Sequence, residues 1–409
     1  MAPRTVYVHV GPLKTGTTYL QGVLWSNREL LAERGVCLPL DAFGQQTRAV
    51  MGLMDKRLHR DVTADPQVSR NKWQALVDEV QAWDGSTAVV SMEFLCEARE
   101  PAIRRLVTDL APAQVRVVYT ARDLVRLVPA MWQTHLRNKR TVTWREYIDS
   151  VRDPAAPGSP WGRRLWSQQD PAQVLGRWAS GVPTEQTFVV TVPASSAEPD
   201  LLWRRFASVL DVDPAGFDLD VPRANRSLGA VECEALRRIN SDVAERIPGP
   251  VYVDLVKRFV AREVLEREPN EHALVLPASE LAWVRERSAG QMAAIRDGGY
   301  ALIGDLSELA DDAALPSETR APDDIDEADV VALLGRVSAA VVVEIARRQG
   351  GRRWSGPRST EQPQPSPGEL GLAGVSLRPG GRRHGGAAAQ RALRMARRLA
   401  THLPRRSGR

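Results

Sequence analysis

The sequence has 409 residues, of which 43% are hydrophobic and 26% charged, a composition typical of a globular protein of roughly one to three domains. It contains no run of eighteen apolar residues and no apolar segment before residue 5. We therefore expect no membrane-spanning helix and a cytoplasmic location. The three cysteines, Cys37, Cys96 and Cys233, are odd in number and widely spaced, which argues against a disulfide framework and against a metal site.

The net charge of +5 is unevenly distributed along the chain. Residues 350–409 contain thirteen arginines, no lysine and two glutamates, a charge of +11 that leaves −6 on residues 1–349. The basic character therefore belongs to this tail and gives no reason to expect sequence-specific binding of nucleic acid by the folded body. Gly, Pro, Ser, Gln and Arg dominate the tail, which predicts disorder. It is either simply solvated or in contact with an anionic lipid, glycan or nucleic-acid surface.

The first elements expected along the chain are a strand, a loop and a helix. Residues 5–10 alternate as in a strand, a turn follows at Gly11, and from Thr17 onward apolar residues recur at helical spacing. Short valine-rich runs predict further buried strands at residues 87–91, 115–120 and 187–192.

Helical patterns lie between and beyond these strands. They are centred on residues 73–80, 103–110 and 202–210. Strands that alternate with helices predict an α/β fold of the P-loop NTPase-like kind, a parallel sheet with helices on both faces. Residues 311–330 are acidic and contain prolines, as expected of a linker, and residues 328–348 fit one amphipathic helix.

The loop Gly11-Pro-Leu-Lys-Thr-Gly-Thr-Thr18 is the strongest functional signal. Its two glycines have P-loop spacing, but Thr17 stands where a nucleoside triphosphatase carries lysine, and the lysine is Lys14 instead. A loop that enters a helix points backbone N–H groups and the positive end of the helix dipole at one place, which favours an anion. Lys14 adds a charge there, and the hydroxyls of Thr15, Thr17 and Thr18 add hydrogen-bond donors. Gly11, Lys14, Thr15, Gly16, Thr17 and Thr18 are the predicted phosphate-binding residues.

The segment from Val8 to Gln21 resembles the 5′-phosphosulfate-binding loop of sulfotransferases, whose usual form is Pro-Lys-(Ser/Thr)-Gly-Thr-Thr. The resemblance implies that residues 1–310 form a sulfotransferase-like domain. Composition and periodicity predict that a linker and helix follow at 311–349 and the disordered tail at 350–409. The resemblance also implies 3′-phosphoadenosine 5′-phosphosulfate (PAPS) as sulfuryl donor, without a metal, and Lys14 as the catalytic residue that stabilises the departing 5′-phosphate. The acceptor is then a hydroxyl or amine of a small molecule, glycolipid or glycan.

A second motif follows the strand at residues 115–120. Arg122-Asp123 is similar to the family's 3′-phosphate motif, in which a serine follows the arginine by eight residues, but here Ala130 occupies that position. A guanidinium at a strand end can hold a phosphate through two parallel hydrogen bonds, and the alternative is an ion pair with Asp123. Arg126, one helical turn later, and Thr134 are the two candidates to compensate for the missing serine.

The candidate general base is Glu93, directly after the strand at residues 87–91. Transfer of a sulfuryl group to a hydroxyl needs a group that takes the proton. The alternative is that Glu93 only begins the next helix. Two other functions remain open from the sequence: an ATP-dependent P-loop kinase or phosphatase, and a non-catalytic nucleotide-binding protein of the same fold. Thr17 in place of lysine speaks against the first, and Ala130 keeps the second open.

Overall fold

The computed structural model describes residues 4–56, 66–194, 197–221, 226–269, 273–310 and 321–349. The chain divides into two compact units, Met1–Val330 and Val331–Arg409, which are described separately. The candidate site lies entirely in the first unit. In the second, the described residues belong to helix α14 (Glu327–Gln349), which spans the residues expected to form an amphipathic helix. The arginine-rich segment 350–409 lies outside the described residues, so its disorder remains an expectation.

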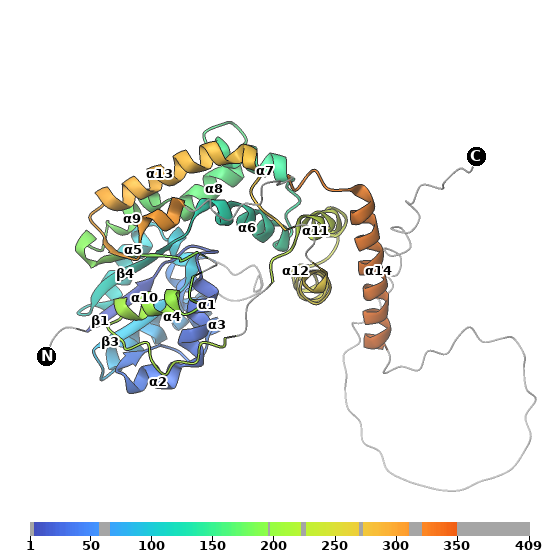
Figure 1. Ribbon diagram of the computed structural model, residues 1–409. Helices are drawn as coiled ribbons and strands as arrows, with labels where there is room; N and C mark the ends of the chain where they lie inside the picture. Colours follow the sequence, from blue (N-terminus) through green and yellow to red (C-terminus); the bar gives the residue numbers. More distant parts are fainter. Residues whose placement is uncertain are drawn as a thin grey trace, which may run out of the picture. The chain divides into compact units, whose positions relative to one another are not determined.

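The first unit is built on a six-stranded sheet in which every strand pair is parallel. The strand order is β2-β3-β1-β4-β5-β6, so β1 lies in the middle, between β3 and β4 (Figure 1). Thr5 of β1 is in register with Thr87 of β3 and with Gln114 of β4. The strands are β1 (Thr5–His9), β2 (Val36–Cys37), β3 (Thr87–Ser91), β4 (Gln114–Ala121), β5 (Thr187–Thr191) and β6 (Ala301–Ile303).

The helices that connect the strands cover both faces of the sheet. Those of the first unit are α1 (Thr17–Ser26), α2 (Arg28–Glu33), α3 (Phe43–Leu53), α4 (Pro66–Ala82), α5 (Glu100–Leu110), α6 (Leu124–Arg137), α7 (Trp144–Arg152), α8 (Pro160–Gln169), α9 (Pro171–Trp178), α10 (Leu201–Val209), α11 (Ala230–Val243), α12 (Gly249–Tyr252) and α13 (Leu281–Asp297). Three short or irregular helical segments also matter below: the 3-10 helices η1 (Glu93–Glu97) and η4 (Leu265–Arg267) and the π-helix η3 (Val253–Val264).

The alternation of side chains along each strand divides the core into two layers. Val6 and Val8 of β1 pack with buried residues of α3, α4, α5 and α9 on one face. Tyr7, between them in sequence, packs with buried residues of α1, α2 and α10 on the other face. Because both faces are covered, the strands can be apolar throughout, as the valine-rich runs are.

The predicted α/β class, the parallel sheet and the four predicted strands are confirmed, with ends that differ by one residue at most. β2 and β6, which are two and three residues long, are not among the predicted strands. The helix expected from Thr17 is divided at Asn27, whose side-chain amide donates hydrogen bonds to the carbonyl oxygens of Val23 and Asp218. All three cysteines are buried and free. No helix within the described ranges has the length and apolarity that a membrane crossing requires.

Candidate functional site

The three predicted segments meet at the carboxyl edge of the sheet. His9, at the end of β1, pairs in register with Ser91 of β3 and with Val118 of β4. The loop after β1, Glu93 after β3 and Arg122 after β4 therefore emerge side by side. The chain passes from β1 to one neighbour and later to the other, so β1 marks the point at which the strand order reverses, where ligands bind in open α/β sheets.

The loop from Gly11 to Gly16 has a backbone shape that its residues explain. A Cβ atom on Gly11 would lie 2.1 Å from Oγ1 of Thr120 and 2.4 Å from Nε2 of His9, so only glycine fits. Gly16 has a φ of 81° and Lys14 a φ of 71°, and left-handed residues of this kind are found in loops whose N–H groups converge on an anion. Gly16 caps α1, where Thr17 is buried and Thr18 exposed.

A buried hydrogen-bonded network of hydroxyl groups and one imidazole ties the loop to the ends of β1, β3 and β4. Thr15 Oγ1 donates to the carbonyl oxygen of Pro12 at 2.6 Å and lies 2.6 Å from Oγ1 of Thr120. Because Thr15 has one hydroxyl proton, Thr120 is the donor between the two. His9 Nδ1 lies 2.8 Å from Oγ of Ser91, with a longer 3.5 Å contact from Nε2 to Thr120. Burial lowers the pKa of His9 to about 3, so the ring is neutral and structural. The Thr15 hydroxyl is already engaged within the loop.

Lys14 lies in an unusually positive environment. Burial, together with the nearby charges of Arg137, Arg122 and Lys257, lowers its pKa to about 8. Glu266 opposes the shift, but its carboxylate is already bound to Arg137, with Nη1 2.6 Å from Oε1. The site therefore holds more positive than negative charge, and an anion would relieve this imbalance.

Two arginines beside the loop have buried nitrogen atoms without partners. The Nε atoms of Arg122 and Arg137 are buried, and neither has a hydrogen-bond partner among the residues that the structure describes. Arg122 Nη1 donates to the carbonyl oxygen of Lys14 at 2.8 Å, which ties the strand end of β4 to the loop. Burial and the neighbouring charge of Arg126 lower the pKa of Arg122 to about 10. Buried donors that lack acceptors are costly, and a polar ligand beside either arginine could supply one.

Arg126 differs from Arg122 in its contacts. Its Nε lies 2.5 Å from Oδ2 of Asp123, and its backbone N–H donates to Oδ1 of the same carboxylate at 2.8 Å. Asp123 is fully buried and caps α6. Arg126 thus lies beside the strand end as expected, with its guanidinium engaged by Asp123. That it binds the nucleotide remains a prediction. Arg122 Nε is 3.9 Å from Asp123, so the ion pair considered as its alternative role exists but is loose.

Glu93 is the first residue of the 3-10 helix η1, at the end of β3. Its Oε2 accepts a 2.9 Å hydrogen bond from Nε2 of Gln21, which lies one helical turn beyond Thr17 on α1. One turn of α-helix is about 5.4 Å along the axis. The carboxylate is therefore held next to the first turns of the helix that carries the phosphate loop, where a general base for an acceptor bound there would have to lie.

Four residues around the loop are not among the predicted site residues. Gln21 and Gln169 orient Glu93 and the loop, the latter by donating from Nε2 to the carbonyl oxygen of Leu13 at 2.9 Å. Arg137 and Lys257 contribute charge near Lys14. Gln21 has a sequence signal, since it lies four residues after Thr17 on one helix face. The others reach the loop from more than 100 residues away, which no local pattern reveals.

Across the described part of the chain, no cluster of three or more His, Cys, Asp or Glu side chains could hold a metal ion. No protein-family model and no curated protein matches the sequence. Among solved structures, the chain is similar to a sulfotransferase from Alicyclobacillus acidocaldarius, with 15% identity and a TM-score of 0.36 over 55% of this chain and 87% of that one. What this chain does must therefore be inferred from its own residues.

Proposed function

We propose that this chain is a sulfotransferase that moves a sulfuryl group from PAPS to a hydroxyl or amine of a small molecule, glycolipid or glycan. The observation that carries the proposal is the positive site around Lys14. There, burial and three nearby cations lower the pKa of the lysine, and the buried Nε atoms of Arg122 and Arg137 have no hydrogen-bond partner in the described part of the chain. An anionic ligand at the N-terminus of α1 would offset the positive charge around Lys14 and could accept from Arg122, which already contacts the loop.

The residues present fit a nucleotide with phosphates at both ends. The loop from Gly11 to Gly16 and the Lys14 ammonium would hold the 5′ end, and Arg122, as the family resemblance implies, the 3′-phosphate. Arg122 also donates to the carbonyl oxygen of Lys14, so one residue would couple the two phosphate positions. When bound, PAPS supplies an electrophilic sulfuryl group and a phosphate leaving group.

Each remaining residue has one role in the reaction. Lys14 neutralises the negative charge that grows on the 5′-phosphate as its bond to sulfur breaks. Glu93 takes the proton of the attacking hydroxyl, and Gln21 keeps its carboxylate in place. Asn27, which ends α1, and the buried Thr15–Thr120 pair hold the loop and helix rigid.

One observation weighs against a kinase that uses ATP with Mg²⁺. The acid nearest the end of β4, Asp123, is fully buried and is engaged by the backbone N–H and guanidinium of Arg126. Its carboxylate is therefore not free to bind a magnesium ion or a water molecule of its shell. Thr17 in place of the P-loop lysine points in the same direction.

The test of the proposed function is a transfer assay with the full chain, PAPS and a mixture of hydroxyl acceptors, in which the release of 3′-phosphoadenosine 5′-phosphate (PAP) is followed. Wild-type protein should release PAP in an acceptor-dependent manner, and Lys14→Ala should not. Release of PAP that is equally fast with and without acceptor, or unaffected by Lys14→Ala, would contradict the proposal. Contact of residues 350–409 with an anionic surface is a separate proposal. Its test is whether deletion of these residues lowers the retention of the protein on a membrane or polyanion.

A further inference from the structure

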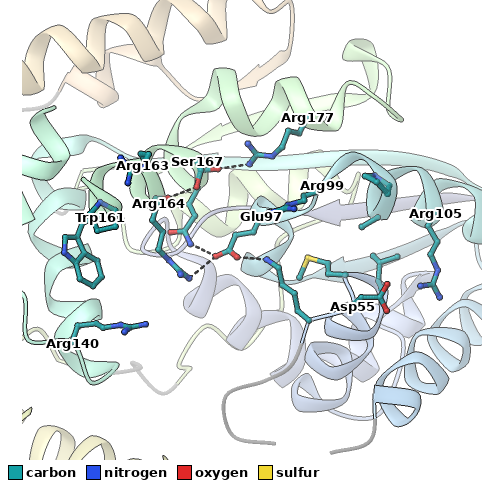
Figure 2. Close-up of a pocket in the computed structure, with 17 residues that line it drawn as sticks. Asp55, Glu97, Arg99, Arg105, Arg140, Trp161, Arg163, Arg164, Ser167 and Arg177 are labelled. Carbon is teal, nitrogen blue, oxygen red and sulfur yellow. Dashed lines mark hydrogen bonds and ion pairs between the residues drawn. The ribbon is translucent and has the colours of Figure 1, made fainter. Parts of the chain in front are cut away.

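A large cleft, to which the last residue of η1 contributes, has a strongly basic lining. Its volume is about 1080 Å³, and its walls come from the end of α3, from η1 and the start of α5, from Arg140 after α6, and from α8 and α9. Among the described residues that line it, seven are basic and two, Asp55 and Glu97, are acidic. Figure 2 shows Glu97 in the middle, with Arg140 and Trp161 on one side and Arg99 and Arg105 on the other.

Most of the acidic charge in the cleft is already neutralised. Glu97 accepts from Lys56 Nζ at 2.6 Å, from Arg164 at 3.4 Å and from the side-chain amide of Gln168 (Figure 2). Asp55 pairs with Arg70, which lies outside the lining, at 3.3 Å. Glu97 thus pairs with Lys56 and Arg164, and Arg105 pairs with Asp109 outside the lining at 3.3 Å, which leaves four of the seven basic side chains of the described lining without a counter-charge.

Four of the basic side chains have no acidic partner among the described residues, and one of them, Arg177, donates instead to the backbone carbonyl oxygens of Cys96, Ala98 and Ser167. Within the described ranges, Arg99, Arg140 and Arg163 form no ion pair with a carboxylate; Arg140 lies 5.9 Å from the ring centroid of Trp161, and Arg163 donates to the carbonyl oxygen of Ala156 at 3.4 Å. Residues 1–349 carry a net charge of −6, so this positive lining stands against an acidic background. A concave site of one sign concentrates ligands of the opposite sign.

The cleft is joined to the candidate catalytic groups by two pairs of residues. Glu93 and Glu97 are the first and last residues of η1. In a 3-10 helix, backbone positions four residues apart are separated by about 8 Å along the axis. Gln168 and Gln169 are neighbours at the end of α8: the first binds Glu97 in the cleft, and the second binds the carbonyl oxygen of Leu13 in the phosphate loop. Glu93 is not among the residues that line the cleft, so an acceptor held there would have to extend beyond the cleft, along η1, to meet it.

We propose that this cleft is the acceptor site and that the acceptor is an acidic oligosaccharide, whose carboxylate or sulfate groups bind Arg99, Arg140 and Arg163 while a hydroxyl meets Glu93. The inference rests on the proposed function. The size of the cleft is that of a ligand with a few rings, and Trp161 adds an apolar wall against which a ring can lie. Duplex nucleic acid would need a more extended surface, typically of about 1,000–2,500 Å².

The test compares two variants of the full chain that lose the same charge. One replaces Arg99, Arg140 and Arg163 by alanine, and the other replaces Arg382, Arg383 and Arg391 of the basic tail. The probes are tetragalacturonate and neutral galactotetraose, which have the same length. Wild-type protein should bind the acidic probe at least tenfold more tightly than the neutral one. The cleft variant should lose this preference, the tail variant should keep it, and all three proteins should bind PAP equally.

Two results would overturn the inference. One is an affinity for tetragalacturonate that falls equally in both variants, or in neither. The other is a cleft variant that loses affinity for a 20-base-pair duplex and not for the saccharide, which would assign the cleft to nucleic acid. Since PAP affinity is measured in parallel, a failure of the proposed function is recognised separately: it appears as absence of PAP binding by the wild-type protein.

Discussion

Gln21 donates a 2.9 Å hydrogen bond to the carboxylate of Glu93, and this contact joins the helix behind the phosphate loop to the end of the neighbouring strand. The group proposed to take the acceptor's proton is thus positioned by the same helix whose N-terminus is proposed to hold the donor. Binding of the donor and activation of the acceptor would depend on one rigid element.

Glu93→Gln should lower turnover by about 10²- to 10⁴-fold, because an amide cannot take the proton of the attacking hydroxyl. PAP affinity should stay within about twofold, since Glu93 is not among the groups proposed to bind phosphate. Steady-state kinetics and calorimetry measure the two quantities. Glu100→Gln, which changes an exposed glutamate close by in sequence, is the control and should leave both unchanged. Normal turnover in Glu93→Gln would show that Glu93 is not the general base and only begins η1.

PAP affinity should decrease as the pH rises above about 8, because Lys14 then loses its proton in the free protein. The bound anion favours the ammonium form, so binding above this pH takes up a proton. Calorimetry in buffers with different heats of ionisation detects that proton. Lys14→Arg keeps its charge over the whole range and should show no such dependence. Identical pH profiles for the wild type and Lys14→Arg would show that Lys14 is not the titrating group.

The same shift has an opposite consequence for the stability of the free protein. The pKa of Lys14 is about 8 in the folded protein, whereas an unperturbed lysine, as in the unfolded chain, has a pKa of 10.5. Between these two pH values the unfolded chain therefore binds more protons than the folded protein. The free energy of unfolding contributed by Lys14 therefore rises with pH across this window and is constant below it. Relative to Lys14→Met, the ligand-free wild type should gain thermal stability from pH 8 to pH 10.5. A constant difference between the two proteins would contradict the shift.

Arg122→Ala should discriminate between nucleotides with and without a 3′-phosphate. Loss of a hydrogen bond to a charged group costs about 1.5–3 kcal/mol, which corresponds to a roughly 10- to 150-fold weaker affinity for PAP. Adenosine 5′-phosphate lacks the 3′-phosphate and should bind the variant about as well as it binds the wild type. An equal loss for both nucleotides would mean that Arg122 acts through its bond to the carbonyl oxygen of Lys14 instead.

Gly11→Ala should destabilise the protein and abolish PAP binding, because its Cβ would lie 2.1 Å from Thr120 Oγ1 and force the loop away from β4. Overpacking of this kind costs about 1–3 kcal/mol. Gly44→Ala is the control, since nothing lies within 4 Å of its added Cβ in α3, and it should keep both stability and binding. Thermal melting and calorimetry check both variants. Unchanged binding in Gly11→Ala would show that the loop does not need this close approach.

The sequence predicted the sheet class and the loop because both have local signals. The strand Thr87–Ser91 was predicted with its observed ends, since a short valine-rich run bounded by polar residues has few alternatives. β2 and β6 were missed because two or three residues are too few to show a period. The strand order was not predictable either, since it depends on contacts between residues about 80 to 110 positions apart.

The candidate site was predictable in its parts and not in its assembly. Gly11, Lys14 and Arg122 have motif signals, whereas Arg137 approaches Lys14 from the end of α6 and is oriented by Glu266, 129 residues later. The engagement of the Thr15 hydroxyl by Pro12 and Thr120 also depends on β4, which a loop motif does not describe. The basic cleft has no local sequence signal, because its basic residues are scattered from Lys56 to Arg177.

Calorimetric titration of the full chain with PAP tests the central claim most directly, when it is repeated with ATP and Mg²⁺ and with Lys14→Ala. The site around Lys14 should bind PAP with a stoichiometry of one, bind ATP with Mg²⁺ much more weakly, and lose PAP affinity in Lys14→Ala while that variant melts no lower than the wild type. A correctly folded wild-type protein that does not bind PAP, or that prefers ATP with Mg²⁺, would contradict the assignment of the loop as a cradle for a bisphosphorylated adenosine.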